Sequence, residues 1–573
     1  MDFDMNVFQR EAEIALETRL SALKAALSGR VPKIAPPFPA VTLIFSVSDG
    51  AKRAVSAQGT GGDVGTAWDL ALVALHNVMA QHDLRGRFLR LDWIEGVETW
   101  NWGILRKRLG NVKRNYCRRG IALDTNFNQM FLEQELNANA MLYGGNQIPH
   151  CVVNEKNFIV ALQQKYGRAA SADFADDTPV HMLASAGLFC GEDGVVHELY
   201  GNNRNAGRRR VEPLDSNTLD HVIKDAADFL ARQVGNDGRF IYGYHPCFDR
   251  QIPAYNALRH ASTLYSMLEA WEQTGDAALI SAIDRGLGYL RQKFIRVIGD
   301  MAFVVDTGDE IKLGANATAI LALSKYAALT GTDRDAVLMQ QLALGILHMQ
   351  QRDGSFIHVL NWPDLSVKEK FRIIYYEGEA AFALMRLYQL TKDARWITAV
   401  ERAFDHFIAK DYWKYHDHWL SYCTNELIIH RPENRYFRFG IQNFDGYLDF
   451  VLQRITTFPT LLELMMAGRK MLDRLKSMPE AASLLGGFDE EKFNRALHFR
   501  AAYLLNGHFW PEYAMFFKNP DRILGAFFIR HHAFRVRIDD VEHYLSGLIA
   551  YRNHIASGAR DRPGPAALDA TGT

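Results

Sequence analysis

The apolar positions between residues 214 and 554 follow a repeated pattern of two helices joined by a short turn. The clearest copy begins at Tyr255-Asn256-Ala257, runs through an apolar helix to Thr274-Gly275-Asp276 and continues into a second helix. Two further copies begin at Lys312 and Tyr376, and each leads to its own short polar turn. Self-similarity at a period of tens of residues indicates a repeat architecture.

The turns carry the residue types that end one helix and begin the next. Gly275 and Gly331 follow apolar helices, where a left-handed residue can close the last turn. Asp276 and Asp333 follow at the place where an N-cap begins a helix. Each repeat is therefore predicted to be a helical hairpin.

The two helices of a hairpin differ in how their apolar residues are distributed. In a second helix, Ile283, Leu287 and Leu290 form one apolar stripe between charged residues, which is typical of an outer helix. The first helices, such as 314–323 and 378–384, are apolar nearly all round and begin with glycine and alanine. Because small side chains let helices crowd together, we expect the first helices to form an inner ring.

Six inner helices can be placed along the chain, each preceded by an outer helix. Their predicted starts are Tyr255, Lys312, Tyr376, Asp417, Thr456 and Arg537. Six such hairpins close into an (α/α)6 toroid, so a mainly α domain is predicted over residues 213–556. The Pro-, Gly- and Ala-rich residues 557–573 are expected to form a disordered tail.

Residues 1–212 do not follow the hairpin pattern and are predicted to form a smaller α+β domain. Val41–Ser48 and Phe88–Ile94 have the pattern of strands, and Thr66–Met79 has that of a helix. Two short strands are expected on either side of Gly191-Glu192-Asp193-Gly194.

Composition and charge are those of an ordinary soluble globular protein with more than one domain. The chain has 573 residues, of which 48% are hydrophobic and 23% charged, and its formal net charge is -1. That balance disfavours nucleic acid as a partner, because phosphate binding usually leaves a strong basic excess. No apolar stretch is long enough to cross a bilayer, and the acidic N-terminal segment does not resemble a signal peptide, so a cytoplasmic location is expected.

The cysteines and glycine motifs do not indicate a cofactor. The five cysteines are scattered without a CxxC pair, which disfavours a disulfide framework or a structural zinc site. The Gly-rich stretch 59–65 does not match a phosphate-binding loop, and we interpret it as a turn. We therefore expect neither a cofactor nor a metal.

A basic run from Arg106 to Arg119 follows Trp93, Trp100 and Trp102. Aromatic rings beside arginine and lysine can hold a polyanion or a sugar polymer. A solvated helix face or a contact between the two domains is the alternative interpretation.

The parallel inner helices should begin on one face of the ring, where their dipoles direct positive charge into a common funnel. Aromatic rings, carboxylates, amides and cations are expected to meet there, together with residues of the loops that lead to the helices. The candidate catalytic residues are Tyr255, His260, Glu377, Glu379, Asp539 and Asp540. The candidate binding residues are Tyr242, Tyr244, Asn256, Arg259, Lys312, Asn316, Tyr376, His418, Trp419, Arg537 and His543.

This mixture of side chains suits a carbohydrate, whose hydroxyls need planar polar partners and whose apolar faces stack on rings. The Thr-Gly-Asp turn at 274–276 and the helix starts Gly-Glu-Ala-Ala at 378–381 and His-Ala-Ser-Thr at 260–263 resemble the six-hairpin glycosidase superfamily of (α/α)6 toroids. The resemblance covers residues 214–554. It implies that fold and, as activity, a glycoside hydrolase or a uronate-processing enzyme.

The segment Arg537–His543 is also similar to the Arg-Trp-Asp-Tyr-His ending of glucuronyl C5-epimerases. Val541 and Glu542 depart from that pattern.

Two chemistries fit the candidate residues. A hydrolase needs one protonated and one ionised carboxyl, which Glu377 or Glu379 could form with Asp539 or Asp540. A uronate lyase or epimerase needs a base at the carbon next to the carboxylate and a cation or amide that neutralises the charge. The segment Tyr255–His260 contains all of these types.

The same residues have structural interpretations, which would fit a non-catalytic scaffold or a glycan-binding protein. Asn256 can satisfy a helix end, and the helix dipole alone favours Glu377 in a first turn. If the protein is an enzyme, Glu377, His260 and Asp540 should face one cavity. If it is a scaffold, these three should be buried in separate hydrogen-bonded pairs.

Overall fold

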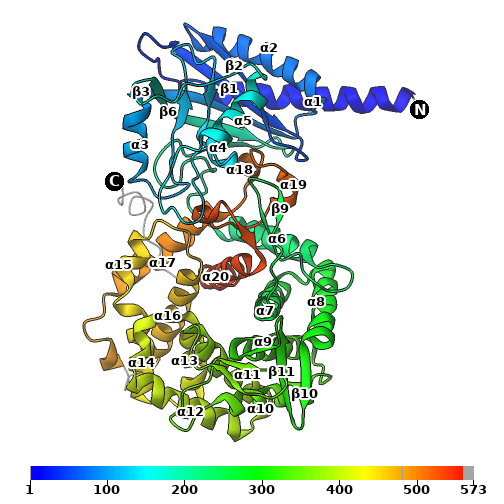
Figure 1. Ribbon diagram of the computed structural model, residues 1–573, viewed down its shortest axis with the longest axis vertical. Helices are drawn as coiled ribbons and strands as arrows, with labels where there is room; N and C mark the ends of the chain where they lie inside the picture. The colour runs from blue at the N-terminus through cyan, green and yellow to red at the C-terminus, as the bar shows by residue number, and fades with distance from the viewer. Residues whose placement is uncertain (1, 479–481, 559–573) are drawn as a thin grey trace.

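A computed structural model describes residues 2–478 and 482–558, in which helical hairpins form a ring beside a sheet-containing module (Figure 1). Residues 559–573 of the predicted tail lie outside the described residues. No helix of the described residues combines the length and the apolar character needed to span a membrane.

The inner ring consists of six helices. They are α7 (Ala257–Thr274), α9 (Leu313–Thr330), α11 (Tyr375–Thr391), α13 (His418–His430), α16 (Thr460–Lys476) and α20 (Ile538–Ala556). Each contacts the next, and α20 contacts α7, so the ring is closed (Figure 1). The predicted starts agree with these helices, with the largest offset at Thr456, which precedes the helix start at Thr460. The described inner helices thus form the ring expected of an (α/α)6 arrangement.

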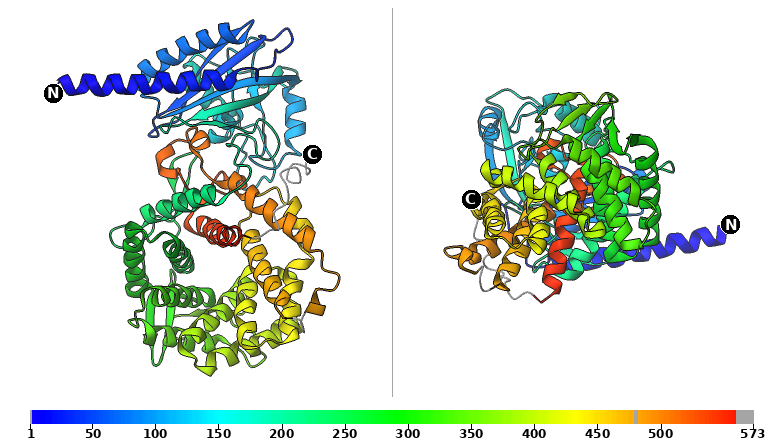
Figure 2. Two further views of the ribbon diagram at one scale, coloured as in Figure 1. Left: turned by 180° about the vertical axis from the view of Figure 1, so that it is seen from behind. Right: turned by 90° about the horizontal axis from the view of Figure 1, so that it is seen from below.

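Six outer helices precede the inner ones in the chain. They are α6 (Ser216–Gln233), α8 (Ala277–Tyr289), α10 (Ala336–Met349), α12 (Ala394–Ala409), α14 (Asn434–Asp445) and α17 (Glu490–Leu504), and the short α15 (Leu448–Gln453) lies between α14 and α16. The view from behind shows these helices around the inner ring (Figure 2, left). Because inner and outer helices alternate, all inner helices run in the same direction.

The turn prediction is confirmed at the first hairpin and corrected at the second. Gly275 ends α7 in a left-handed conformation with φ 62°, and Asp276 accepts the backbone N–H of Leu279 at 2.9 Å. Gly331 ends α9 in the same way. The N-cap of α10 is Asp335, however, rather than Asp333, because residues 333–335 form an extra turn.

The amino-terminal module contains a sheet of seven strands in the order β2-β1-β3-β6-β4-β5, with β7 paired to β6. The strands are β1 (Val41–Ser48), β2 (Val55–Gly61), β3 (Phe88–Asn101), β4 (Gly120–Ala122), β5 (Met130–Phe131), β6 (Pro179–Cys190) and β7 (Val196–Glu198). The helices of the module are α1 (Asp2–Leu27), α2 (Val64–His82), α3 (Trp102–Leu109), α4 (Glu133–Ala138) and α5 (Glu155–Tyr166). All strand pairs are antiparallel.

The strand and helix predictions in this module agree with the structure, except that β3 and β6 are longer than expected. The Gly-rich stretch has a packing role, because a Cβ atom at Gly61 would lie 2.8 Å from the backbone nitrogen of Ala67 in α2. Asp63 then caps α2 by accepting the N–H of Thr66 at 2.8 Å. The domain boundary near residue 212 stays a prediction.

The basic run lies in contacts within the module and at its seam with the ring. Arg118 pairs with Glu133 at 3.3 Å and Arg119 with Glu98 at 2.7 Å. Arg108 stacks over Trp100 at 4.1 Å. Arg114 donates to the carbonyl oxygen of His531 in the ring, so the interpretation as a contact between the two domains fits Arg114. Binding of a polyanion stays an untested prediction.

Small strands between the ring helices were not predicted. They are β8 (Gly243–His245), β9 (Arg250–Gln251), β10 (Ile295–Ile298), β11 (Met301–Asp306), β12 (Glu310–Lys312), β13 (Val359–Asn361), β14 (Val367–Glu369) and β15 (Val536–Arg537). Two short helices, α18 (Pro511–Ala514) and α19 (Pro520–Ile523), lie between α17 and β15 in the chain. The pairing of β15 with β8 places Arg537 beside Gly243.

The close packing of the inner ring gives a stability prediction at Gly314. A Cβ atom there would lie 2.7 Å from Cδ1 of Leu258 and 2.7 Å from Cδ1 of Tyr376. We expect Gly314→Ala to lower the free energy of unfolding by about 1–3 kcal/mol, as overpacking usually does. Gly288→Ala, in outer helix α8 with nothing within 4 Å, is the matched control and should be neutral or stabilise by up to about 1 kcal/mol. Denaturant titration followed by circular dichroism measures both, and equal effects would contradict the packing argument.

Candidate active site

The first turns of the inner helices surround a cavity of about 350 Å³, which we call the funnel. Its lining comes from five inner helices, α7, α11, α13, α16 and α20, and from the loops around 454–459 and 529–537. The predicted residues that line it are Asn256, Arg259, Tyr376, Glu379, His418, Trp419, Arg537, Asp539, Asp540 and His543. The convergence expected of parallel inner helices is therefore observed for these residues.

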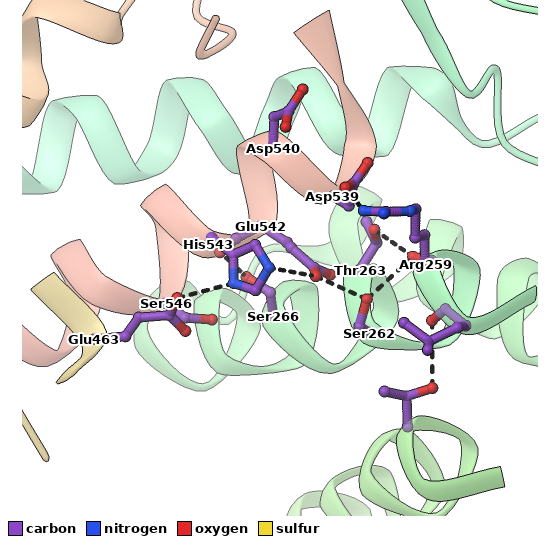
Figure 3. Close-up of polar contacts among 12 residues, drawn as sticks. Arg259, Ser262, Thr263, Ser266, Glu463, Asp539, Asp540, Glu542, His543 and Ser546 are labelled. Carbon is purple, nitrogen blue, oxygen red and sulfur yellow. Dashed lines mark hydrogen bonds and ion pairs between the residues drawn. The ribbon is translucent and has the colours of Figure 1, made fainter. Parts of the chain in front are cut away.

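Asp539 and Asp540 begin α20 and are held by arginines. Arg537 contacts Asp539 at 3.0 Å and Asp540 at 2.8 Å, and Arg535 also donates to Asp540. Arg259 of α7 forms an ion pair with Asp539 (Figure 3). Burial alone would raise the pKa of Asp540, but the charges and hydrogen bonds of Arg537 and Arg535 outweigh it and lower the pKa. Asp540 is thus an ionised anchor for the arginines and does not suit the role of a general acid.

The floor of the funnel contains His418 of α13 and His543 of α20, and behind them Glu463 of α16 contacts both imidazoles. Nδ1 of His543 lies 2.8 Å from Oε2 of Glu463, and Nε2 of His418 lies 3.8 Å from the same oxygen. The two imidazole rings are 5.3 Å apart between centroids and nearly perpendicular. Figure 3 shows His543 between Glu463 and Glu542. Three neighbouring inner helices thus bring two imidazoles to one carboxylate.

The two histidines of the floor differ in their protonation. Burial would lower the pKa of His543, but the charge and hydrogen bond of Glu463 raise it. Burial lowers the pKa of His418 to about 4. The imidazolium form is therefore favoured at His543, whereas His418 is a neutral imidazole at neutral pH, and its Nε2 has no hydrogen-bond partner. Two neighbouring groups with pKa values shifted in opposite directions are what acid–base chemistry requires.

Glu379 and Glu542 are two further buried carboxyls of the funnel. Burial raises the pKa of Glu542 to about 7 and raises that of Glu379 well above its ordinary value. Glu542 accepts the hydroxyl of Ser262 at 2.7 Å. The missing side chain of Gly314 leaves room for Glu379, whose Oε2 has no hydrogen-bond partner.

The raised pKa of Glu542 predicts a pH-dependent stability. The folded state favours the protonated carboxyl, so this contribution to stability is fully present at acid pH and is lost as the pH rises through about 7. Glu542→Gln keeps an acceptor for Ser262 and cannot ionise. We expect the Tm of the variant to exceed that of the wild type by a margin that grows between about pH 5 and about pH 8. The charged neighbours His543, Glu463 and Arg259 are present in both proteins, so their own titration does not by itself distinguish the variant from the wild type. If the difference in Tm stays constant over this range in thermal melts, the raised pKa of Glu542 is contradicted.

Tyr255 and His260, two candidate catalytic residues, lie outside the funnel. The ring of His260 is completely buried, with Nδ1 2.9 Å from the Tyr255 hydroxyl and Nε2 2.9 Å from the carbonyl oxygen of Gly286. Both nitrogens are engaged in joining α7 to outer helix α8. The structural interpretation therefore holds for this pair.

Three other candidates are engaged elsewhere. Glu377 accepts the N–H of Phe356 at 3.4 Å and borders a separate surface cavity. The shared cavity that an enzyme was expected to have at Glu377, His260 and Asp540 is therefore not observed, and each of the three has its own hydrogen-bond partners. Lys312 is paired with Asp306 at 2.7 Å. The amide of Asn316 is bonded to backbone groups, among them the N–H of Val304 at 2.7 Å.

Two aromatic candidates lie behind the rim of the funnel. Tyr242 is buried and is a hydrogen-bond partner of Arg537, which it helps to orient. Tyr244 is buried beneath the guanidinium of Arg522, 5.4 Å from its ring centroid. Neither ring lines the funnel as a stacking surface for a sugar.

The sequence did not single out Glu463, Ser262 or Arg454. A usable signal exists for Glu463, because it is a charged residue in the otherwise apolar first turns of an inner helix. Arg454 lies in the loop before α16, where its Nε donates to the hydroxyl of Thr456 at 2.6 Å. No carboxylate of the described residues forms an ion pair with Arg454, so its charge remains available to a ligand in the funnel.

The amino-terminal module supports the rim of the funnel. The side-chain amide of Asn115 donates to the carbonyl oxygen of Arg530 at 2.8 Å, and Arg114 donates to that of His531. His531 and His532 line the funnel. The module therefore fixes the loop that carries these rim residues.

His418, Glu463 and His543 could also hold a metal. Each offers one nitrogen or oxygen within 4.8 Å of the others, and no other such group occurs in the described part of the chain. Imidazole and carboxylate are common ligands of divalent metals. The 2.8 Å contact between His543 and Glu463 is also the length of a charge-assisted hydrogen bond, which needs no ion.

Comparisons with known proteins gave distant structural likenesses. No family model matches the chain, and no match was found among the curated proteins. Similar solved structures include a D-mannose isomerase, with 12% identity and a TM-score of 0.46 over 58% of this chain and 97% of that chain. A cellobiose 2-epimerase from Bacillus thermoamylovorans B4167 has 11% identity and a TM-score of 0.46 over 59% of this chain and 100% of that chain. An α-1,6-mannanase of Salegentibacter sp. HEL1_6 has 10% identity and a TM-score of 0.42 over 58% of this chain and 99% of that chain.

Proposed function

We propose that this protein is a carbohydrate-processing enzyme that transfers a proton on an acidic sugar, as an epimerase or a lyase of a uronate bound in the funnel. The observation that carries the proposal is the pair of imidazoles, His418 and His543, facing each other at the floor beside Glu463. Neutral His418 is the base, and His543, charged through its contact with Glu463, is the acid.

The reaction follows from these roles. His418 removes the proton from the carbon next to the sugar carboxylate, and the electron pair left behind is delocalised into that carboxylate. Because the two rings lie 5.3 Å apart on one side of the carbon, an epimerase would turn the intermediate in the funnel, so that His543 returns a proton to the opposite face of the same carbon. In a lyase, the electron pair forms a carbon–carbon double bond, the bond from the β-carbon to its oxygen breaks, and His543 protonates the leaving oxygen.

The charge of the funnel supports an acidic substrate. Glu379 and Glu542 have raised pKa values, and the other two carboxyls of the lining, Asp539 and Asp540, are already paired with Arg259, Arg535 and Arg537. Arg454 adds a further positive charge. A sugar carboxylate would neutralise it.

A glycoside hydrolase has less support from the same geometry. It needs one ionised and one protonated carboxyl on either side of the bond. Glu379 and Glu542 are both shifted towards the protonated form, while Asp539 and Asp540 are held by arginines. The similarity of Arg537–His543 to glucuronyl C5-epimerases stays a prediction.

Incubation with oligomers of glucuronate, galacturonate and mannuronate in D2O tests the proposal. An epimerase exchanges deuterium into the carbon next to the carboxylate, seen by NMR, and a lyase produces the ultraviolet absorbance of an unsaturated uronate. New reducing ends without unsaturation would identify a hydrolase instead. Saturable binding without turnover would identify a glycan-binding protein, and either of these results contradicts the proposal.

Removal of metals gives a second test. Because His543 and Glu463 can form a hydrogen bond without an ion, we expect dialysis against EDTA to leave the activity and the Tm unchanged. Loss of activity that a single divalent metal restores would show that His418, Glu463 and His543 form a metal centre, and would contradict their assignment as proton-transfer groups.

A further inference from the structure

A second cavity lies on the other side of the ring, along the later turns of the inner helices. Its volume is about 500 Å³, and residues of all six inner helices line it. We call it the rear cavity and define it by Tyr265, Phe382, Tyr422, Asn425 and Glu426, together with Trp419, which borders both cavities. It is large enough for one or two sugar rings.

The walls of the rear cavity are aromatic. The ring centroids of Phe382 and Tyr422 are 5.6 Å apart, and those of Trp419 and Tyr422 are 5.8 Å apart. Tyr265 adds a fourth ring. Adjacent aromatic faces are suited to the apolar face of a pyranose, and a phenol hydroxyl can bond to its hydroxyls.

The charges of the rear cavity are balanced. Its lining contains the cations Lys325, Arg386, Arg469 and Lys470 and the anions Glu269, Glu426, Glu463 and Asp473. Several of them are already paired, for example Arg469 with Asp473 at 2.7 Å. In contrast to the funnel, this cavity therefore favours a neutral ligand.

Buried polar atoms of the rear cavity lack partners. Asn425 is only 3% exposed, and its amide nitrogen donates to the carbonyl oxygen of Ala467 at 2.9 Å while Oδ1 accepts nothing. Oε2 of Glu426 is likewise without a donor. An unsatisfied buried acceptor costs about 1–3 kcal/mol, so a ligand hydroxyl that donated to it would be stabilised.

A short hydrogen-bonded chain joins the rear cavity to the funnel. The hydroxyl of Tyr422 donates to Oε1 of Glu463 at 3.1 Å, and Oε2 of Glu463 binds Nδ1 of His543 at 2.8 Å. Figure 3 shows Glu463 reaching from α16 towards His543, with Ser546 of the rear cavity beside it. A ligand that competes for the Tyr422 hydroxyl would remove its hydrogen bond to Glu463 and so change the hydrogen bond between Glu463 and His543.

We propose that the rear cavity is a second binding site, for a neutral sugar of one or two rings, and that its occupancy is transmitted to His543 through Tyr422 and Glu463. Binding at this site stands independently of the proposed function, whereas its effect on turnover rests on that function.

Calorimetric titration of the full chain with glucose and with maltose tests the binding. We expect saturable binding that Asn425→Leu weakens at least tenfold, because this change removes the free acceptor and fills part of the cavity. Tyr265→Phe, which removes a single hydroxyl, is the second variant and should weaken binding less. Arg454→Gln changes only the funnel and should leave binding unchanged. Circular dichroism confirms that each variant is folded.

Three results would overturn the proposal. The first is no saturable binding of either probe to the wild type. The second is binding that survives both Asn425→Leu and Tyr265→Phe. The third is binding that Arg454→Gln abolishes, which would place the sugar in the funnel. If binding follows the expected pattern while no uronate is turned over, the rear site stands and the proposed function fails.

The coupling has its own readout in the NMR signal of the His543 ring nitrogens. The probe should shift that signal in the wild type and leave it unmoved in Tyr422→Phe, which keeps the aromatic wall but breaks the chain to Glu463. An equal shift in both proteins would overturn the coupling.

Discussion

Replacing His543 with asparagine is expected to lower kcat on a uronate by about 10²–10⁴-fold, the usual contribution of a general acid or base. The amide of asparagine can still donate to Glu463 from near the position of Nδ1. The loss of kcat therefore reports the missing transferable proton rather than a disrupted structure around Glu463. His418→Asn should have an effect of the same size, because removal of the base stops the same proton transfer.

The double variant should lose little more than either single variant, since both residues serve one transfer. His260→Gln is the matched control, because His260 is a buried inner-helix histidine outside the funnel. It should lower the free energy of unfolding by about 1–3 kcal/mol through unpaired polar groups while kcat per folded molecule stays the same. A kcat of His543→Asn within tenfold of the wild type would contradict the assignment.

The pH profile follows from the same two groups. Turnover needs His418 neutral, which holds above its pKa of about 4, and His543 protonated, which holds below its raised pKa. We therefore expect kcat/KM to fall at acid pH as His418 gains a proton and to fall at alkaline pH as His543 loses one. His543→Asn should remove the alkaline limb.

The ring itself could be predicted from the sequence because its signals are local. Gly275 and Asp276 determine where one helix ends and the next begins, and these positions are visible in the chain without any long-range contact. The apolar character of the inner helices then indicates which helix of each hairpin is enclosed. The β-strands between the helices gave no comparable signal, since most are two to four residues long.

The orientation of the candidate residues on their helices could not be predicted as well. In an α-helix, successive residues are about 100° apart, so Arg259 points into the funnel while His260 points towards α8. Glu377 and Glu379 are about 200° apart and likewise face different cavities. The location of a first turn predicts at which end of the ring the funnel lies, but it does not predict which side chains of that turn line the funnel.

The pairings inside the funnel depend on contacts far apart in sequence. Arg259 of α7 meets Asp539 of α20 only because the ring closes between its first and last inner helices. Glu463 acquires its importance from His418 and His543 on the neighbouring helices. Because these partners come from other helices, the sequence of each segment alone suggests a catalytic role for Asp539 and gives no reason to select Glu463.

The charge of Arg454 leads to the second prediction with a large effect, which concerns substrate binding. A unit charge about 4 Å from a carboxylate contributes about 1–4 kcal/mol, depending on the effective dielectric. Arg454→Gln is therefore expected to raise KM for a uronate by about tenfold or more, with a much smaller change in kcat because Arg454 takes no part in proton transfer.

Two comparisons separate this charge effect from a general loss of structure. Arg552→Gln removes a partly exposed arginine of α20 that pairs with Asp220 of α6 at 2.7 Å and does not line the funnel, and it should leave KM unchanged. Raising the ionic strength should narrow the difference between wild type and Arg454→Gln, because salt screens the attraction that the variant has lost. If KM is the same in wild type and Arg454→Gln at low salt, the funnel does not recognise its ligand by negative charge. The two histidines would then act on a neutral sugar.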